Sequence, residues 1–182
     1  MRALVSFVMT SLDGYYEGPN GELDWANVDG EFFEFSNRQD AYIDTLLFGR
    51  AGYEHMAAYW PDATDADPEV TAFMNSVEKV VVSSSLDQVE WNNATLARGG
   101  PAETVTALKQ RPGKEIALFG SVRLTASLLE LGLVDELRVM VNPVLLGGGA
   151  SLYASLHQRV RLELRQTRTF HSGNVLLTYR PA

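Results

Sequence analysis

Residues 113–149 constrain the fold of this chain more than any other stretch. The short apolar run 116–119 is typical of a buried strand, and Gly120 and Ser121 end it with a flexible step and a hydroxyl suited to capping a helix. Leucines then recur at helical spacing, and apolar residues alternate with polar ones across 137–142, which indicates a second strand. A strand, a helix and a strand in this order predict a parallel pair with a right-handed crossover.

The junction at Gly120 has the chemistry of an anion site. Unpaired amide N–H groups and the positive end of the helix dipole face the carboxyl end of a strand that precedes a helix. Gly120 carries no side chain that would block a phosphate, and Arg123 adds a positive charge to the first helical turn. An ordinary strand-to-helix turn has the same pattern, because a single Gly-Ser pair is weakly specific. The residues alone leave both interpretations open.

Three more apolar runs indicate strands at 3–9, 45–49 and 79–82. Together with 116–119 they give four strands, each followed by small polar residues or glycine and then by a helix. This order predicts an α/β fold with three layers, in which helices cover both faces of a mostly parallel central sheet. The carboxyl ends of the strands should meet at one edge, where ligands bind in open α/β sheets. Two of the junctions carry an arginine, which favours a phosphorylated ligand.

The C-terminal part of the chain has a different pattern. Segments 161–167 and 174–180 suit strands, and 171–174 supplies the turn of an antiparallel hairpin. Before this hairpin, 151–156 is expected to form a helical turn. No internal repeat or linker interrupts the sequence, so residues 1–182 are expected to form a single domain.

The composition excludes several classes of function. The 182 residues include no cysteine, which excludes disulfides, thiolate metal sites, a cysteine nucleophile and a zinc deaminase site with cysteine ligands. The three histidines are far apart in sequence, so no metal site is expected. A net charge of −8 without a basic cluster argues against nucleic acid as a partner. No apolar run reaches the roughly 18 residues of a membrane helix, and the N-terminus lacks a signal-peptide layout, so a cytoplasmic protein without a membrane partner is expected.

Two neighbouring motifs carry a resemblance to a known family. Gly-Leu-Val-Asp-Glu-Leu-Arg at 132–138, followed by Asn-Pro-Val-Leu-Leu-Gly-Gly-Gly at 142–149, resembles the hallmark of the dihydrofolate-reductase-like family. This family includes the reductase domain of bacterial riboflavin biosynthesis and many stand-alone reductases. The resemblance covers nearly the whole chain, since Ser-Leu-Asp-Gly at 11–14 and Gly-Arg at 49–50 are also similar to family motifs.

The resemblance implies a dihydrofolate-reductase-like fold and an NADPH-dependent oxidoreductase, similar to phosphoribosylaminouracil reductase or dihydrofolate reductase. NADPH would transfer a hydride to a small pterin- or pyrimidine-like heterocycle, or to another small carbonyl or imine substrate. A homodimer is also implied, in which the apolar run 137–146 could serve as the interface or could equally be an internal strand. The alternative function is a non-catalytic dimeric protein on the same scaffold that binds a nucleotide or heterocycle.

Roles for single residues follow from the same resemblance. Asp13 and Asp29 are the candidates for proton delivery or substrate hydrogen bonding, with Trp25 and Phe33 as apolar walls. A carboxylate between such walls would have a raised pKa, which suits an acid working near neutral pH. The cofactor would contact residues at three strand ends: Gly49, Arg50, Ser83, Ser84, Gly120, Ser121, Val122 and Arg123.

The chain departs from the family pattern at three places. Folate reductases carry a buried carboxylate where Gly30 stands here between two acidic residues, which argues against folate as the substrate. Many relatives have threonine at the position of Gly52, and Gly-Gly at the position of Gly120 and Ser121. The peptide bond between that glycine pair can be cis in folate reductases. A cis bond before Ser121 is therefore a hypothesis here, although it would cost about 3–4 kcal/mol.

Overall fold

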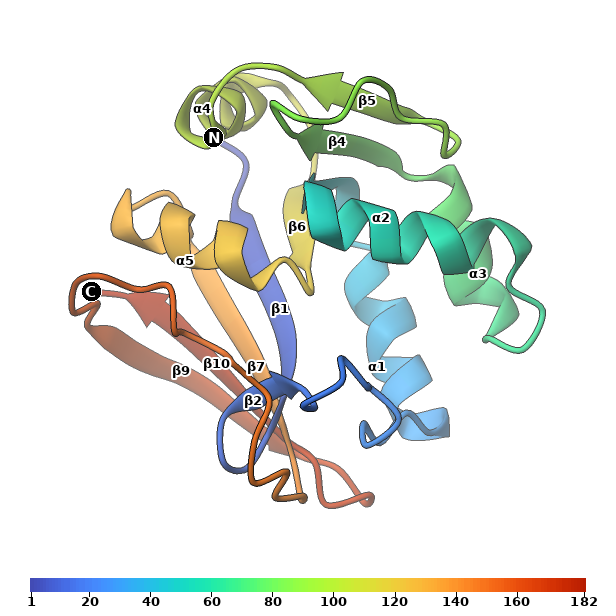
Figure 1. Cartoon of the computed structure of the whole chain (residues 1–182), viewed down its shortest axis with the longest axis vertical. Coiled ribbons are helices and arrows are strands. Elements are labelled where there is room, and N and C mark those ends of the chain that lie inside the picture. Colours follow the sequence, from blue (N-terminus) through green and yellow to red (C-terminus); the bar gives the residue numbers. More distant parts are fainter.

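A computed structural model describes the whole chain, Met1 to Ala182. Its largest part is an 8-stranded sheet in the order β5-β4-β3-β6-β1-β7-β10-β9 (Figure 1). The strands of this sheet are β1 (Leu4–Ser11), β3 (Ile43–Gly49), β4 (Glu78–Val82), β5 (Ala94–Ala97), β6 (Glu115–Phe119), β7 (Glu136–Asn142), β9 (Leu162–Thr169) and β10 (Val175–Pro181). The helices are α1 (Gly30–Asp40), α2 (Arg50–Tyr59), the 3-10 turn η1 (Trp60–Asp62), α3 (Pro68–Ser76), α4 (Pro101–Gln110) and α5 (Val122–Glu130). None of these helices has both the length and the apolar character needed to cross a membrane.

The sheet is mostly parallel and ends in an antiparallel hairpin. β1 runs parallel to β6 and β7, β3 runs parallel to β4 and β6, and β4 runs parallel to β5. β10 is antiparallel to both β7 and β9. The predicted α/β fold with a mostly parallel sheet and a C-terminal hairpin is therefore confirmed.

The first strand of the chain lies between β6 and β7. β6 and β7 are parallel members of one sheet, as the pattern of 113–149 predicts, but they are not neighbours. The pattern of a βαβ unit cannot show that a third strand enters between its two strands, because that strand comes from the other end of the sequence. β7 is paired on both edges, by β1 and β10, so it is an internal strand. Its edges are therefore not free to form a dimer interface.

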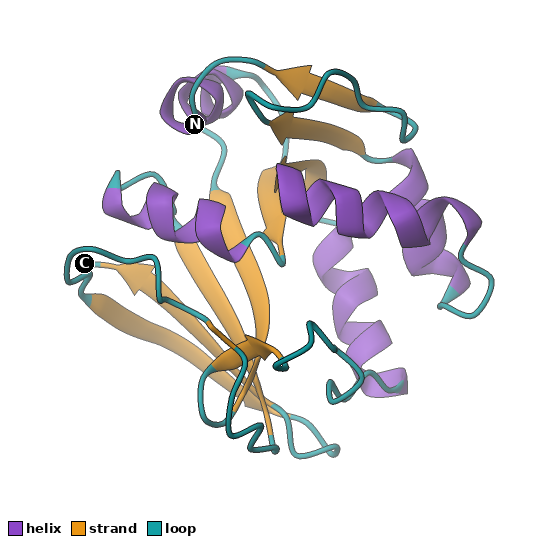
Figure 2. Ribbon diagram, viewed as in Figure 1, coloured by secondary structure: helices purple, strands orange, loops and turns teal.

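Helices cover both faces of the sheet, as the three-layer prediction requires (Figure 2). On one face, Leu108 of α4 and Leu128 of α5 pack into a buried cluster with Leu4 of the central strand. On the opposite face, Tyr53 of α2 and residues of α3 pack around Phe48 of β3, and α1 lies against the same face nearer to β10. The strands in the middle read as continuous apolar runs because both of their faces are buried.

Two short strands form a second sheet that the sequence does not predict. β2 (Tyr15–Glu17) pairs antiparallel with β8 (Ala150–Ser151). The predicted helical turn at 151–156 is right only in part: Ser151 pairs with Tyr15 as a strand, and residues 152–155 form a turn, in which the amide of Leu156 donates to the carbonyl of Tyr153 over 3.1 Å. Strands of two or three residues are too short to carry a periodicity, so no pattern in the sequence announces them.

Asp40, at the end of α1, is a buried carboxyl group. The residue is only 7% exposed and its Oδ1 has no hydrogen-bond partner. Burial raises the pKa of Asp40 from 3.8 to about 7, because the charged form loses its hydration. The folded protein therefore holds this proton up to about pH 7, whereas the unfolded chain releases it near pH 4. Stability falls as the pH rises through this window, because the folded state binds the proton more tightly than the unfolded chain does.

Replacing Asp40 with asparagine is expected to remove this pH dependence. The variant and the wild type should unfold with similar free energies at about pH 4. At about pH 8 the variant should be more stable by on the order of 2–4 kcal/mol, from ~1.4 kcal/mol for each unit of pKa shift. Denaturant titrations at the two pH values measure the difference, with Asp24→Asn as a control at an exposed position. An equal gain at both pH values would contradict the buried-carboxyl explanation.

Candidate functional site

The carboxyl ends of β4, β3, β6 and β1 lie side by side at one edge of the sheet, which we call the carboxyl edge (Figure 1). These strands are neighbours and run in one direction, so the residues that follow them meet there, as predicted. A hydrogen bond of 3.1 Å from Arg50 Nη1 to Ser85 Oγ connects the end of β3 to the turn after β4. The amide of Gly120 donates to the carbonyl of Phe7 over 3.2 Å, which connects β6 to β1.

α2 and α5 begin next to each other at the carboxyl edge. A Cβ atom at Gly52, in the first turn of α2, would lie 2.6 Å from Oγ of Ser121, the N-cap residue of α5. Neither helix start is capped by a side chain. The first amide N–H groups of both helices, and the positive ends of both helix dipoles, therefore lie in one small region. Such a region is suited to binding an anion.

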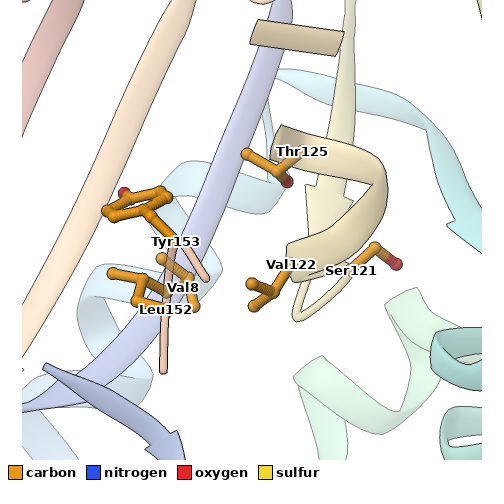
Figure 3. Close-up of a pocket in the computed structure, with 6 residues that line it drawn as sticks. All are labelled: Val8, Ser121, Val122, Thr125, Leu152 and Tyr153. Atoms are coloured by element: carbon orange, nitrogen blue, oxygen red, sulfur yellow. The ribbon is translucent and has the colours of Figure 1, made fainter. Parts of the chain in front are cut away.

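Ser121 is the most informative side chain of this junction. It is 7% exposed, and its hydroxyl makes no hydrogen bond within the protein. Contrary to the prediction it does not cap α5, because its backbone, with φ −84° and ψ 64°, lacks the extended conformation that aims a cap at the first amides. Figure 3 shows Val122 facing Val8 and Leu152, while the hydroxyl of Ser121 points to the other side. A buried hydroxyl without a partner is unfavourable unless a ligand or water supplies one.

The turn into α5 uses a left-handed glycine and not a cis bond. Gly120 has a φ of 63°, a conformation that glycine adopts without the strain that a Cβ atom brings. The chain contains no cis peptide bond, so the hypothesis of a cis bond before Ser121 is wrong for this structure. The positive φ turns the chain from β6 into α5 with the peptide bond trans.

Arg50 lies where the sequence predicts, directly after β3 and beside the turn after β4. In addition to its bond with Ser85, its Nε donates to Oε1 of Glu54 over 2.9 Å. The hydroxyl of Ser83 accepts hydrogen bonds from two amides of the turn, whereas Ser84 is exposed. Ser83 therefore orders the turn, while Ser84 and Ser85 are exposed.

Arg98 is an arginine at this edge that the sequence-based candidates omit. It directly follows β5, and its Nη2 donates to the carbonyl of Asp87 over 3.0 Å. The amide of Ser83 donates to the carbonyl of Ala97 over 3.4 Å, so Arg98 adjoins the turn after β4 on the side opposite Arg50. A basic residue directly after a short apolar strand is the sequence signal that would have found it.

Asp13 lies in the first loop with both carboxylate oxygens engaged. It accepts hydrogen bonds from Oγ of Ser11 (2.7 Å), from the amide of Leu146 (3.1 Å) and from the amide of Gly147 (2.8 Å). The Ser11 hydroxyl lowers the pKa of Asp13, and the two amides lower it further. The expected raised pKa is therefore wrong for Asp13, because this exposed carboxylate accepts hydrogen bonds and is not enclosed by apolar walls.

The acidic residues beside Gly30 are both used by the fold. Oδ1 of Asp29 caps α1 by accepting from the amide of Phe32 over 2.9 Å. Its Oδ2 makes no hydrogen bond with the protein. Glu31 accepts from the amide and the ring of His171 at the hairpin turn, and these bonds lower the pKa of Glu31.

Trp25 and Phe33, the two predicted apolar walls, make separate contacts and do not pack against each other. The indole N–H of Trp25 donates to a carbonyl of its own loop over 3.0 Å. Phe33 packs edge-on against Phe32, with ring centroids 6.0 Å apart, and joins the cluster around α2 and α3. The aromatic surface next to Gly120 is formed by Phe7 and Phe119, whose centroids are 6.2 Å apart.

The mostly parallel 8-stranded sheet, with its C-terminal antiparallel strand pair and helices on both faces, defines the class: an α/β protein with a dihydrofolate-reductase-like fold. The chain matches the model of the RibD C-terminal domain family over residues 2–176 and belongs to that family.

Three comparisons illustrate the match. The uncharacterized protein YyaP of Bacillus subtilis (strain 168) is 37% identical over 182 residues, which cover 98% of this chain and 94% of that protein. A putative riboflavin biosynthesis protein from Shewanella sp. PV-4 has a TM-score of 0.77 at 23% identity and covers 99% of both chains. Dihydrofolate reductase from Enterococcus faecalis, in complex with NADP(H) and RAB-propyl, has a TM-score of 0.66 at 17% identity, covering 98% of this chain and 96% of that one. At these identities the solved structures show a shared fold.

Proposed function

We propose that this protein is an NADPH-dependent reductase that transfers a hydride to a small pterin- or pyrimidine-like heterocycle, or to another small carbonyl or imine substrate. The observation that carries the proposal is the buried, unpartnered hydroxyl of Ser121 between the starts of α2 and α5. A free donor in a region of positive helix dipoles suits a phosphate group. Support also comes from the family and from structural neighbours whose names include reductases.

The carboxyl edge offers suitable groups along the length of a dinucleotide. The pyrophosphate would lie at the α2–α5 junction, held by amide N–H groups and by the hydroxyl of Ser121, with Gly120 allowing close approach. Arg50 and Arg98 contact opposite sides of the turn that exposes Ser84. Guanidinium groups bind phosphate through paired N–H donors, so this turn suits the 2′-phosphate that distinguishes NADPH from NADH.

NADPH would supply the hydride, and the residues of the protein would bind and orient the two reactants. Phe7 and Phe119 pack edge to face, with their ring planes at 83°, and would give the nicotinamide or substrate ring apolar contacts beside Gly120. The unpaired Oδ2 of Asp29 is available to accept a hydrogen bond from the substrate. Arg123, exposed in the first turn of α5, adds positive charge beside the pyrophosphate position.

NADPH binding is the first test of this function. At a concentration about one hundred times its Kd, NADPH should stabilise the protein by about 2.7 kcal/mol, which raises the midpoint of thermal unfolding. NADH should stabilise it less, because it lacks the 2′-phosphate. Turnover is then measured as loss of reduced nicotinamide absorbance with pterin, flavin-precursor and quinone substrates. An unfolding midpoint that saturating NADPH leaves unchanged would overturn the proposal.

The second candidate is a non-catalytic protein that binds a nucleotide or heterocycle on the same scaffold. The observation that favours it is Asp13, one of the two acids expected from the sequence, whose pKa is lowered and whose oxygens are already engaged. This candidate would be favoured if NADPH stabilises the protein but no substrate of the panel causes oxidation of NADPH.

A further inference from the structure

The glycine-rich turn 144–149 is a conspicuous motif that the proposed cofactor site does not use. The turn instead contacts the first loop of the chain. The amide of Leu12 donates to the carbonyl of Val144 over 2.8 Å, and β8, directly after the turn, pairs with β2 of the first loop. At Gly149, a Cβ atom would lie only 2.1 Å from the carbonyl oxygen of Glu17. The turn and the loop are therefore in direct backbone contact.

Asp13, in the first loop, stabilises this contact through hydrogen bonds to the turn. Its Oδ1 accepts from the amide of Leu146 and its Oδ2 from the amide of Gly147. One carboxylate thereby satisfies two adjacent amides of a turn that lies more than a hundred residues further along the chain. We call Asp13 with these two amides the Asp13 clasp. Hydrogen bonds to a charged acceptor are stronger than those between neutral groups.

The clasp is connected to the start of α5 through β2. Tyr16, in the middle of β2, packs on the cluster that contains Val122 of α5 and Leu152. A displacement of β2 would therefore change the surroundings of the first turn of α5, where the pyrophosphate is proposed to bind.

We propose that Asp13 is a positioning residue, which holds β2 and Tyr16 against the start of α5 and so shapes the cofactor site. The part of this inference that concerns NADPH binding rests on the proposed function. A proton donor at Asp13 would need a free oxygen facing the substrate, whereas both oxygens of Asp13 are bound to backbone amides of the turn. The glycine-rich turn, on this account, is the surface on which the first loop is held.

The test uses Asp13→Ala and Asp13→Asn, with Asp24→Asn as the matched control in the same loop, where the carboxylate is exposed and makes no hydrogen bond. Amide hydrogen exchange should speed up at least about tenfold at Leu146 and Gly147 in Asp13→Ala, because their acceptor is gone. The Kd for NADPH should rise about tenfold, while the denaturant midpoint of the whole domain stays close to that of the wild type. Asp13→Asn keeps one oxygen acceptor and should restore part of the affinity.

The possible failures are distinguishable. Wild-type protein that does not bind NADPH would overturn the proposed function, and amide exchange at Leu146 and Gly147 would still decide whether the clasp exists. Asp13→Ala that binds NADPH as tightly as Asp24→Asn would overturn the positioning role. A loss of affinity that only follows a fall in global stability would also overturn it, because the role would then be purely structural.

Discussion

Replacing Gly52 with alanine is expected to weaken NADPH binding about tenfold or more in the wild type, and to have no such effect in a Ser121→Ala background. The new Cβ would lie 2.6 Å from Oγ of Ser121. A serine hydroxyl can rotate, so the clash would be relieved by moving Oγ away from its position at the junction. The phosphate would lose its side-chain donor, and a lost hydrogen bond to a charged group is worth about 1.5–3 kcal/mol.

A double-mutant cycle measures this coupling directly. Ser121→Ala alone should weaken NADPH binding by a similar factor. The double variant should bind NADPH as tightly as Ser121→Ala alone does. In the Ser121→Ala background the alanine at position 52 should even stabilise the protein, by up to about 1 kcal/mol, because it replaces a glycine within a helix. Gly30→Ala, at a helical glycine with no atoms within 4 Å of the added Cβ, is the control. Equal losses from Gly52→Ala in both backgrounds would show that the two residues do not share a site.

Gly149→Ala is expected to be the most destabilising of these changes. Gly149 has a φ of +134°, and its added Cβ would lie 2.1 Å from the carbonyl oxygen of Glu17. Unlike a serine hydroxyl, a backbone carbonyl cannot rotate away, so β2 and β8 must separate. The loss should be at least about 2 kcal/mol, which lowers the midpoint of thermal unfolding by roughly 4–8 °C in a domain of this size.

Gly147→Ala provides the matched control for Gly149→Ala. Gly147 also has a positive φ, of 71°, but an added Cβ there would have no atom within 4 Å. It should therefore show only the strain of a left-handed alanine, about 1–2 kcal/mol. Thermal unfolding of the two variants side by side measures what the Glu17 contact and the larger φ of Gly149 add together. Equal losses in both variants would refute the close backbone approach as the cause.

The sequence was sufficient to predict the sheet and the edge at which the candidate site lies. β3, β4 and β6 are short apolar runs buried on both faces, and each ends in residues that break a strand, such as Gly49, Ser83 and Gly120. These signals are local, so one chain is enough to detect them. The capping of α1 by Asp29 was predictable for the same reason, because a cap and its amide are three residues apart.

The side-chain roles that were mispredicted depend on contacts distant in sequence. Asp13 was expected to have a raised pKa, but the hydroxyl of Ser11, two residues away, lowers it, and amides 133 and 134 residues away lower it further. Ser121 was expected to cap α5, but its backbone conformation depends on the left-handed Gly120 before it and on the packing of α2 beside it. No local pattern contains this information. The candidate site could therefore be located from the sequence, while the pKa and the hydrogen-bond partners of Asp13 could not be predicted.

The position of β1 between β6 and β7 has a consequence for how the protein is made. Leu4–Ser11 is synthesised well before its two neighbours in the sheet, which are residues 115–119 and 136–142. The apolar strand β1 therefore stays unpaired until about three quarters of the chain has been synthesised. Closing such long loops is slow, and an exposed apolar strand can pair with other chains in the meantime. Nascent chains that end before β7 should thus need a chaperone to stay soluble, and the domain should acquire its fold only late in translation.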